Sequence, residues 1–427
     1  MAKERKYWSP EIETMPLGKL KKLQEERLQT VVTRAYEKTA FYRRKFDEAG
    51  VKPGDIKTVD DLKRLPLVHS LEDFRKAPIF DRLAVPYEEV KYVESTSGTT
   101  GIPMAVLWSK RDWDAVMDLE PRARWTLGAR PEDTVHLLTG FPCCQRGYQE
   151  LGARVLALSA GRGNLDNQIR LGQMIGVTVI EQLPSLALKY FERAKEMGID
   201  VKQLGIRLVS GVGEGWARAY RKKIESEYGV QFADMYGSVD AGLVGAECEA
   251  RQGMHIFLNL CILETINPET AEPLDVGQEG ELVVTLLWNE ATPIIRYRMG
   301  DIASLLPYKL CPCGRTLPKM GMVKGRLAHS VKVKGKRIYP IDLEEVLAST
   351  PGLGEDYQMI VDKPGELDRL KLKIEYKPEA GDAATLKKRL VEAISRDLRV
   401  ESEIELVPLG TLGRPLFKAQ RVVTTYA

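Results

Sequence analysis

Val177-Thr178-Val179-Ile180 and Ile206-Arg207-Leu208-Val209-Ser210 are mainly apolar runs, and residues 186–197 between them have apolar side chains at helical spacing. This order predicts a βαβ unit, in which a helix joins two parallel strands. Two further runs of the same kind, residues 135–138 and 154–158, lie earlier in the chain. The sequence therefore predicts an α/β fold.

The regions on either side of this core differ from it. Residues 1–50 show helical spacing, whereas residues 280–288 and 293–298 are strand-like with no helix between them, which favours antiparallel strands. After residue 325, alternating and helical patterns mix. We expect a large domain over residues 1–325, with a helical N-terminal segment, an α/β core and a β portion near 255–325. A smaller α+β domain would follow over residues 326–427.

Composition limits the classes of function. The 427 residues include 44% hydrophobic and 29% charged side chains, as in ordinary globular proteins. With 63 basic and 60 acidic residues the net charge is +3, so neither nucleic acid nor an anionic membrane is the expected partner. No apolar run reaches the ~20 residues that span a bilayer, and no secretory signal pattern follows the charged first residues. We expect a cytoplasmic protein.

Residues 94–103, Glu-Ser-Thr-Ser-Gly-Thr-Thr-Gly-Ile-Pro, concentrate hydroxyl side chains and glycines in a short loop. Backbone N–H groups and hydroxyls in such a loop can surround phosphate oxygens. The loop has no Gly-Lys-Ser/Thr ending, and G-x-G-x-x-G does not occur after a predicted strand. P-loop NTPases and Rossmann dehydrogenases are thereby disfavoured. An ordinary polar surface turn is the alternative.

This loop resembles the phosphate loop of the adenylate-forming superfamily, especially its phenylacetate–CoA ligase branch. Further resemblances follow in order along the chain: Met235-Tyr236-Gly237-Ser238-Val239-Asp240, Ile295-Arg296-Tyr297-Arg298-Met299-Gly300-Asp301, Gly325-Arg326, residues 335–345 and residues 410–421. The resemblance covers nearly the whole chain. It implies a large N-terminal adenylate-forming domain of several subdomains and a smaller mobile C-terminal α+β domain.

The resemblance also implies a reaction. ATP would convert a carboxylic acid, expected to be aromatic, to an acyl-adenylate, and coenzyme A would then displace AMP. Mg²⁺ would assist. Catalytic roles fall to Lys418, Thr99 and Asp240, with Lys418 contacting carboxylate and phosphate, while Asp301 would accept hydrogen bonds from the ribose. The other nucleotide contacts implied are Ser95, Thr96, Ser97, Gly98, Thr100, Gly101, Gly213, Glu214, Met235, Tyr236 (on adenine), Gly237, Ser238 and Arg326.

Two positions depart from the family pattern. Asp240 stands where the family has a glutamate that helps to hold Mg²⁺, and Mg²⁺ accepts either carboxylate. Ala328 stands where a polar hinge residue is usual. The second departure concerns the motion of the small domain, which would let one site run both half-reactions.

The cysteines suggest a separate metal site. Cys311 and Cys313 form a C-x-C turn, and Cys248 and His255 lie upstream. Three thiolates and one imidazole make a closed tetrahedral zinc set of structural type. Unligated cysteines and a surface histidine are the alternative.

The acid pocket is implied by resemblance alone. Its expected residues are Phe141, Ala160, Gly161, Pro184, Ser185, Gly211 and Tyr236, a small and apolar set that suits a flat aryl acid. Two other functions stay open: an adenylate-forming enzyme with an acceptor other than coenzyme A, and a non-catalytic nucleotide-binding relative. The resemblance is also compatible with a homodimer.

Overall fold

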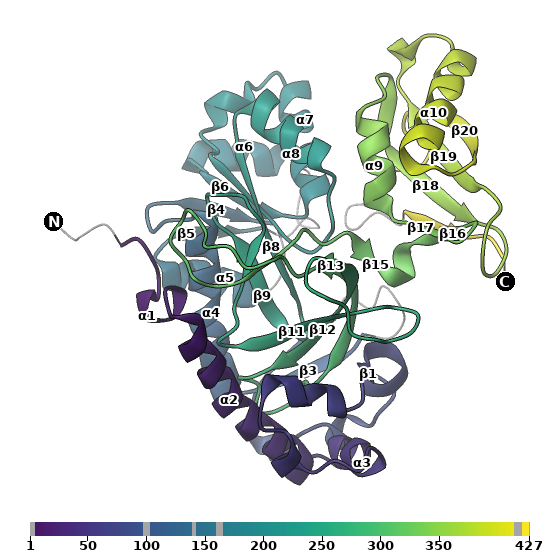
Figure 1. Cartoon of the computed structure of the whole chain (residues 1–427). Helices are drawn as coiled ribbons and strands as arrows, with labels where there is room; N and C mark the ends of the chain where they lie inside the picture. Colours follow the sequence, from purple (N-terminus) through teal and green to yellow (C-terminus); the bar gives the residue numbers. More distant parts are fainter. Residues whose placement is uncertain (1–4, 97–102, 139–141, 159–164, 414–420, 427) are drawn as a thin grey trace. The chain divides into compact units, whose positions relative to one another are not determined.

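The computed structural model describes residues 5–96, 103–138, 142–158, 165–413 and 421–426. The chain divides into two compact units, whose helices and strands are labelled in Figure 1. The first comprises residues 1–157 and 233–323, and the second comprises residues 158–232 and 324–427. The domain boundary expected at residue 325 stays a prediction.

The first unit combines an N-terminal helical segment with mixed sheets. Its helices are α1 (Pro10–Glu13), α2 (Leu17–Lys38), α3 (Ala40–Glu48), α4 (Lys110–Leu127) and α5 (Pro142–Leu151). Its strands are β1 (Val68–His69), β2 (Val90–Ser95), β3 (Ala105–Ser109), β4 (Thr134–Leu137), β5 (Arg154–Ala157), β8 (Gln231–Ser238), β9 (Gly242–Glu247), β10 (Met254–Ile256), β11 (Cys261–Ile266), β12 (Glu279–Leu286), β13 (Tyr297–Ser304) and β14 (Lys319–Met320).

These strands pair in four groups within the first unit, one of which is the antiparallel pair β2 and β3. β4 and β5 are parallel, as the apolar runs predicted. β8, β9, β10 and β14 are antiparallel neighbours in that order. β11, β12 and β13 form the expected antiparallel portion, with β1 parallel to β13 at the edge. Side chains from β8 to β14, from β1 and from helices α2 to α4 share one apolar core.

The second unit contains the βαβ pattern and the C-terminal domain. Its elements are α6 (Leu165–Ile175), β6 (Val179–Gln182), α7 (Pro184–Glu196), β7 (Leu208–Gly211), α8 (Arg218–Tyr228), β15 (Gly325–Arg326), β16 (Val331–Val333), β17 (Lys336–Ile338), α9 (Pro340–Ala348), β18 (Leu353–Val361), β19 (Leu370–Tyr376), α10 (Ala383–Leu398), β20 (Ser402–Pro408) and β21 (Val422–Thr424). β6 and β7 are parallel, so the predicted βαβ unit is confirmed.

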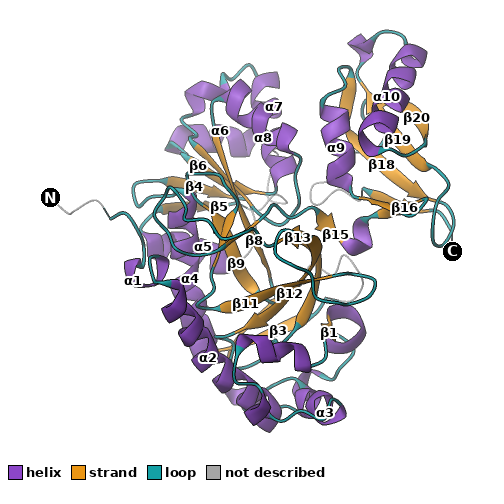
Figure 2. Cartoon of the chain, in the orientation of Figure 1, coloured by secondary structure: helices purple, strands orange, loops and turns teal. Residues whose placement is uncertain are grey.

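The C-terminal sheet has the strand order β20-β19-β18-β21, with α9 and α10 beside it (Figure 2). Helix α10 shows how its sequence sets its ends and its buried face. The Asp382 side chain accepts hydrogen bonds from the first backbone N–H groups, and Arg399 ends the helix in the left-handed conformation. Leu386, Leu390 and Ile394 are buried on one face, as the i, i+4 spacing predicted.

One strand prediction was wrong. Residues 293–298 were expected to be extended, but β13 begins only at Tyr297. Pro293 has no N–H to donate to a ladder, and Arg296 has φ of 46°, which interrupts an extended backbone.

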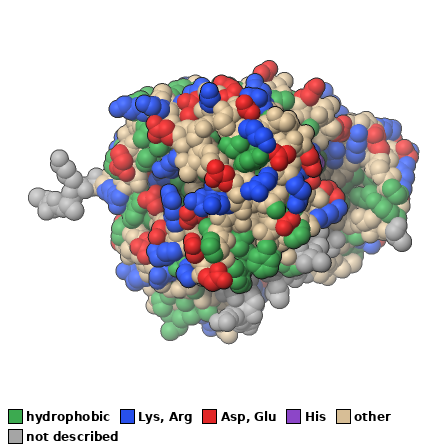
Figure 3. All heavy atoms as spheres, turned by 90° about the horizontal axis from the view of Figure 1, so that it is seen from below, with side chains coloured by type: hydrophobic (Ala, Val, Ile, Leu, Met, Phe, Trp, Pro, Cys, Tyr) green, Lys and Arg blue, Asp and Glu red, His purple; other side chains and the backbone are tan. Residues whose placement is uncertain are grey.

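Charge is mixed on the surface, as the net charge suggested. On the face drawn in Figure 3, basic and acidic side chains are interspersed. Among the described residues, no helix combines the length and apolar character needed to cross a bilayer.

Candidate active site and metal centre

Strands β2 and β3 form a hairpin whose connection contains the predicted phosphate loop. Ser95 ends β2, opposite Ala105 of β3. The Thr96 N–H donates to the Met104 carbonyl at 3.0 Å, and the Met104 N–H donates to the Thr96 hydroxyl at 2.9 Å. These two bonds fix the ends of the loop. Ser97, Gly98, Thr99, Thr100 and Gly101 lie outside the described residues.

The Met235–Asp240 motif lies on β8 and the turn that follows it. Gly237 sits at a bulge where β8 meets β9. A Cβ at residue 237 would lie 2.5 Å from the Gly242 carbonyl oxygen, closer than van der Waals contact permits. Glycine here lets the two strands approach closely and leaves Tyr236 and Ser238 on either side of the bulge.

This motif and the motif on β13 bond to each other reciprocally. The Tyr236 hydroxyl donates to Asp301 Oδ2 at 2.9 Å, and the Tyr297 hydroxyl donates to Asp240 Oδ2 at 2.5 Å. Ser238 donates to the other oxygen of Asp240. Each tyrosine thus holds the carboxylate of the other motif. Burial, with the nearby Asp240 charge, raises the pKa of Tyr297 well above its usual value, so this phenol stays a donor.

The two arginines of the β13 motif anchor it to the rest of the first unit. Arg298 makes a bidentate pair with Glu281, and Arg296 pairs with Glu264 at 3.0 Å. Arg296 also donates to the Leu65 carbonyl at 2.5 Å. Bidentate pairs fix geometry as well as charge, so the arginines fix the strand that carries Tyr297 and Asp301.

Several predicted site residues of the second unit lie together at the start of α7. Pro184 and Ser185 open this helix, and the Ser185 N–H donates to the Glu214 carboxylate at 2.7 Å. Gly211 ends β7, where a Cβ would lie 2.5 Å from the Phe232 ring. Gly213 has φ of +84°, a conformation that favours glycine. The Glu214 carboxylate thus caps α7, a contact that the sequence did not reveal.

The remaining predicted site residues are placed as follows. Arg326 lies on β15 in the second unit, and Ala328 lies in the short 3₁₀ helix Leu327–His329. Phe141, Ala160, Gly161 and Lys418 lie outside the described residues.

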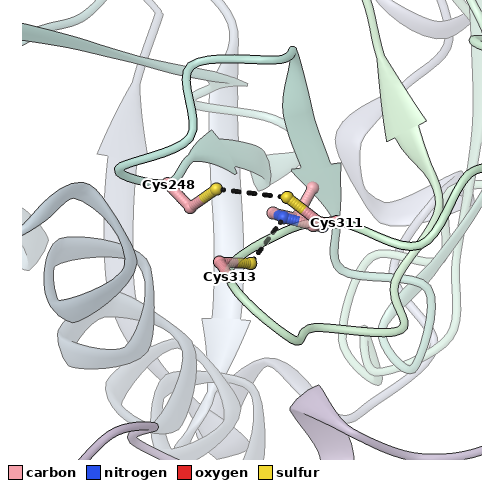
Figure 4. Close-up of side chains that lie close together, drawn as sticks. Cys248, Cys311 and Cys313 are labelled. Carbon is pink, nitrogen blue, oxygen red and sulfur yellow. Dashed lines mark hydrogen bonds between the residues drawn. The ribbon is translucent and has the colours of Figure 1, made fainter.

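The predicted metal ligands come together in the first unit. Cys248 follows β9, His255 lies on β10, and Cys311 and Cys313 lie in the loop after β13. All four are buried, and their ligand atoms lie within 4.8 Å of one another. Figure 4 shows the three cysteine side chains pointing toward one another. The alternative of a surface histidine is wrong, because His255 is fully buried.

The chemistry of these side chains fits a metal. His255 Nδ1 donates to the Leu317 carbonyl at 2.9 Å, which orients Nε2 toward Cys313 Sγ, 3.4 Å away. Such an outer hydrogen bond is typical of metal-binding histidines. The hydrogen bond from Cys248, with His255 beside it, holds the pKa of Cys313 well below its usual range. A thiolate is the form that binds zinc.

The N-terminal segment holds the cysteine loop in place. Arg315 Nε donates to Glu13 Oε2 at 2.6 Å, and both side chains are at most 3% exposed. The Tyr7 hydroxyl donates to the Cys313 carbonyl at 3.0 Å. Gly314 has φ of +87°, and a Cβ there would lie 2.4 Å from the Tyr7 hydroxyl. The C-x-C turn therefore favours glycine at position 314, and Tyr7 packs against it.

Comparison with known proteins gives the family. Residues 335–425 match the AMP-binding enzyme C-terminal domain. A phenylacetate–coenzyme A ligase of Thermus thermophilus is 34% identical over 433 aligned residues, which cover 95% of this chain and 96% of that ligase. The chain belongs to the phenylacetate–coenzyme A ligase family. The Escherichia coli phenylacetate–coenzyme A ligase is 33% identical, with 96% of each chain covered.

Solved structures agree with membership of the phenylacetate–coenzyme A ligase family. A 2-hydroxyisobutyryl-CoA ligase in the postadenylation state with 2-HIB-AMP is 27% identical, with a TM-score of 0.90 over 99% of this chain and 93% of that one. The same enzyme with 2-HIB-AMP and CoA in the thioesterification state gives 0.73 over the same shares. The predicted adenylate-forming fold is confirmed.

Proposed function

We propose that this protein activates an aromatic carboxylic acid with ATP and transfers the acyl group to coenzyme A, releasing AMP and pyrophosphate. Membership of the family makes the chain an AMP-forming acid–CoA ligase. The reciprocal bonding of Tyr236 to Asp301 and of Tyr297 to Asp240 carries the proposal for the nucleotide site. The aromatic character of the acid rests on the curated relatives, which are named for phenylacetate.

In the first half-reaction, a carboxylate oxygen of the acid attacks the α-phosphorus of ATP and pyrophosphate leaves. Charge on the transferring phosphoryl group must be neutralised, and Lys418 would supply a cation at the end of its loop. The loop closed by Thr96 and Met104, which contains Thr99, would surround phosphate oxygens with N–H and hydroxyl donors.

Asp301 would accept hydrogen bonds from the ribose, and Arg326 would contact ribose or phosphate. Because the Tyr236 hydroxyl is bonded to Asp301, the tyrosine ring and the carboxylate are held as one surface for adenosine. Asp240 would hold Mg²⁺, which withdraws charge from phosphate oxygens when bound. Tyr297 and Ser238 orient the Asp240 carboxylate for that task.

In the second half-reaction, the thiol of coenzyme A attacks the acyl carbon of the adenylate. The new thioester bond forms as the bond to AMP breaks, and the thiol proton passes to solvent or base. The solved relative has structures with 2-HIB-AMP and CoA together, which supports coenzyme A over another acceptor.

For the acid, we propose a pocket that includes Pro184 and Ser185 at the start of α7 and Gly211 at the end of β7, all in the second unit. Small residues at helix and strand ends leave room for a flat ring.

The cysteine set is proposed to hold one structural Zn²⁺. Three sulfur ligands and one nitrogen close a tetrahedral site, and their burial leaves no position for substrate. A homodimer and a cytoplasmic location complete the proposal, the latter because the reaction consumes ATP and coenzyme A. Light scattering would measure the oligomeric state.

The decisive experiment is a panel of aryl and aliphatic acids, scored for AMP and pyrophosphate with and without coenzyme A. We expect acid-dependent pyrophosphate exchange without coenzyme A, and AMP and thioester formation with it, highest for aryl acids. A rate of AMP formation that does not depend on coenzyme A would favour another acceptor. A purified, folded protein inactive with every acid would favour a non-catalytic relative.

A further inference from the structure

Arg82 is a cation in the interior of the first unit. It follows the short 3₁₀ helix Ile79–Asp81, and only 4% of the residue is exposed. Its Nε and Nη1 atoms are buried and have no hydrogen-bond partner among the residues that the structure describes. Two residues later, the Ala84 N–H donates to the Ala291 carbonyl at 2.7 Å, which ties this segment to the turn between β12 and β13. Packing of the segment therefore sets the position of the guanidinium.

The guanidinium packs on aromatic rings that lead to Asp240. Its carbon lies 4.6 Å from the centre of the Phe74 ring, a cation–π distance. The Phe74 and Tyr297 rings meet edge to face, with their centres 5.5 Å apart. The Tyr297 hydroxyl in turn donates to Asp240 Oδ2 at 2.5 Å. A continuous chain of contacts therefore runs from Arg82 to the carboxylate that is proposed to hold Mg²⁺.

The charge of Arg82 also acts on the Tyr297 phenol. Burial lowers the pKa of Arg82, and the phenols of Tyr297 and Tyr42 oppose this shift. Because a guanidinium stays protonated in proteins, Tyr297 lies near a permanent positive charge. A neighbouring cation favours loss of a phenol proton, so it strengthens the hydrogen bond that Tyr297 donates to Asp240.

A buried cation without hydrogen-bond partners lowers the stability of a fold. Removing a charge from water costs free energy, and an apolar side chain of similar volume is often as stable or more stable. Each such group in a native protein needs a specific explanation, and departures from packing rules are expected at functional sites. The contacts that lead to Asp240 supply this explanation for Arg82.

We propose that Arg82 is a positioning residue for the Asp240 carboxylate. The ring contacts through Phe74 fix the orientation of Tyr297, and the charge of Arg82 strengthens the bond from Tyr297 to Asp240. The carboxylate thus keeps one orientation while Mg²⁺ and the phosphates of ATP bind. This inference rests on the proposed function, in which Asp240 holds Mg²⁺.

Arg82→Met tests the charge, because methionine keeps most of the aliphatic stem. We expect a melting temperature equal to that of wild type or higher. The Mg²⁺ concentration that gives half-maximal pyrophosphate exchange should rise about 3- to 10-fold, with KM for the acid unchanged. Arg82→Lys should restore part of the wild-type behaviour, because lysine keeps the charge. Arg82→Gln is a second neutral variant, which should give the same result as methionine and replaces it if that variant does not fold.

Metal binding can also be measured without turnover. In the presence of a non-hydrolysable ATP analogue, electron paramagnetic resonance gives the Kd of Mn²⁺, which should rise about 3- to 10-fold in Arg82→Met, the factor expected for Mg²⁺ in exchange. If Arg82 acted only by repelling the metal ion, both the Kd and the Mg²⁺ requirement would fall in this variant. The direction of the change therefore separates positioning from direct repulsion.

Arg122→Met is the matched control. Arg122 of α4 is also buried, and its three guanidinium nitrogens have no hydrogen-bond partner within the described part of the chain. It likewise lies over an aromatic ring, 5.1 Å from the centre of Phe257. Its charged neighbours are Asp118, Glu13 and Arg27. The control should keep the wild-type Mg²⁺ requirement, whatever its melting temperature.

A double-mutant cycle tests the route through Tyr297. Tyr297→Phe alone should raise the Mg²⁺ requirement at least as much as Arg82→Met, and the double variant should show no further rise, because both changes remove one interaction. Additive effects, an unchanged or lowered requirement in the neutral Arg82 variants, or an equal rise in Arg122→Met would overturn the proposal. A wild-type Mg²⁺ requirement in Asp240→Asn would instead refute the proposed role of Asp240, so the two failures are distinct.

Discussion

The hydroxyl of Tyr236 donates to the carboxylate of Asp301 across 2.9 Å, although 65 residues separate them in the chain. Tyr297 and Asp240 make the converse contact. Each motif thus supplies one carboxylate and the donor that orients the other. These two hydrogen bonds join the proposed ribose site to the proposed Mg²⁺ site, so loss of either tyrosine hydroxyl should alter the carboxylate of the opposite motif.

Tyr236→Phe removes one donor from Asp301 and leaves the ring. A hydrogen bond to a charged group contributes about 1.5 to 3 kcal/mol, so we expect KM for ATP to rise roughly 10-fold, with a smaller change in kcat. Asp301→Ala should have the larger effect of the same kind. Steady-state kinetics would check this, with exposed Tyr87→Phe as the control. A change confined to KM for the acid would contradict the ribose role.

Lys418→Ala should nearly abolish acid-dependent pyrophosphate exchange while leaving the fold intact. Loss of a cation that stabilises the transition state costs about 3 to 4 kcal/mol, or a few hundred-fold in kcat. Lys388→Ala, on the exposed face of α10, should leave the rate of pyrophosphate exchange unchanged. Near wild-type exchange in Lys418→Ala would remove this lysine from the mechanism.

Protein purified without added metal should contain about one zinc per chain by elemental analysis, as a closed site with four protein ligands implies. Cys311→Ser should lose the zinc and melt at lower temperature, because a structural metal contributes folding free energy. Cys144→Ser changes a partly buried cysteine of α5 outside the cysteine set. This variant should keep both the zinc and the wild-type melting temperature. Metal-free protein with a wild-type melting temperature would exclude the zinc site.

The pH dependence of the free energy of unfolding should reflect the protonation of Glu344. Burial raises the pKa of this carboxyl to about 7, with Arg421 opposing the shift. Between about pH 4.5 and pH 7 the folded protein therefore keeps a proton on Glu344 that the unfolded chain has lost. The contribution of protonated Glu344 to the free energy of unfolding is complete below about pH 4.5 and is lost as the pH rises to about 7. The loss is on the order of 3 kcal/mol.

Glu344→Gln imitates the protonated form and should weaken this dependence. Thermal unfolding of wild type and variant at pH 5 and pH 8 measures it, and the melting temperature of the variant should fall less over that interval. The exposed Glu379→Gln should behave as wild type. Equal slopes in all three proteins would show that Glu344 is ionised in the folded state.

The sequence predicted what depends on local pattern. Apolar runs gave β4, β5, β6 and β7 to within about two residues, since buried parallel strands are continuously apolar. The spacing of Leu386, Leu390 and Ile394 gave α10. Pro293 and Arg296 were misjudged because an apolar pattern does not reveal a left-handed residue.

Contacts between residues far apart in the chain could not be predicted from local pattern in the same way. Arg421, Lys189 and Asp356 look like any charged residues of a solvated surface, and only the fold brings them together. Nothing in the sequence indicated that Glu344 is buried, because glutamate is seldom buried. The cysteine set could be predicted because the chain has only six cysteines and four histidines. A C-x-C turn brings two of these ligands close together.

The bond between Glu13 and Arg315 spans 302 positions, and this has a consequence for synthesis on the ribosome. At translation rates of 5 to 20 residues per second, α1 waits roughly 15 to 60 s for its partner to emerge. The Cys248 thiol has been made by then, and it lacks the two sulfurs that complete its set. For roughly 3 to 13 s, the time needed to make the 65 residues from Cys248 to Cys313, the nascent chain carries the Cys248 thiol without its partner sulfurs.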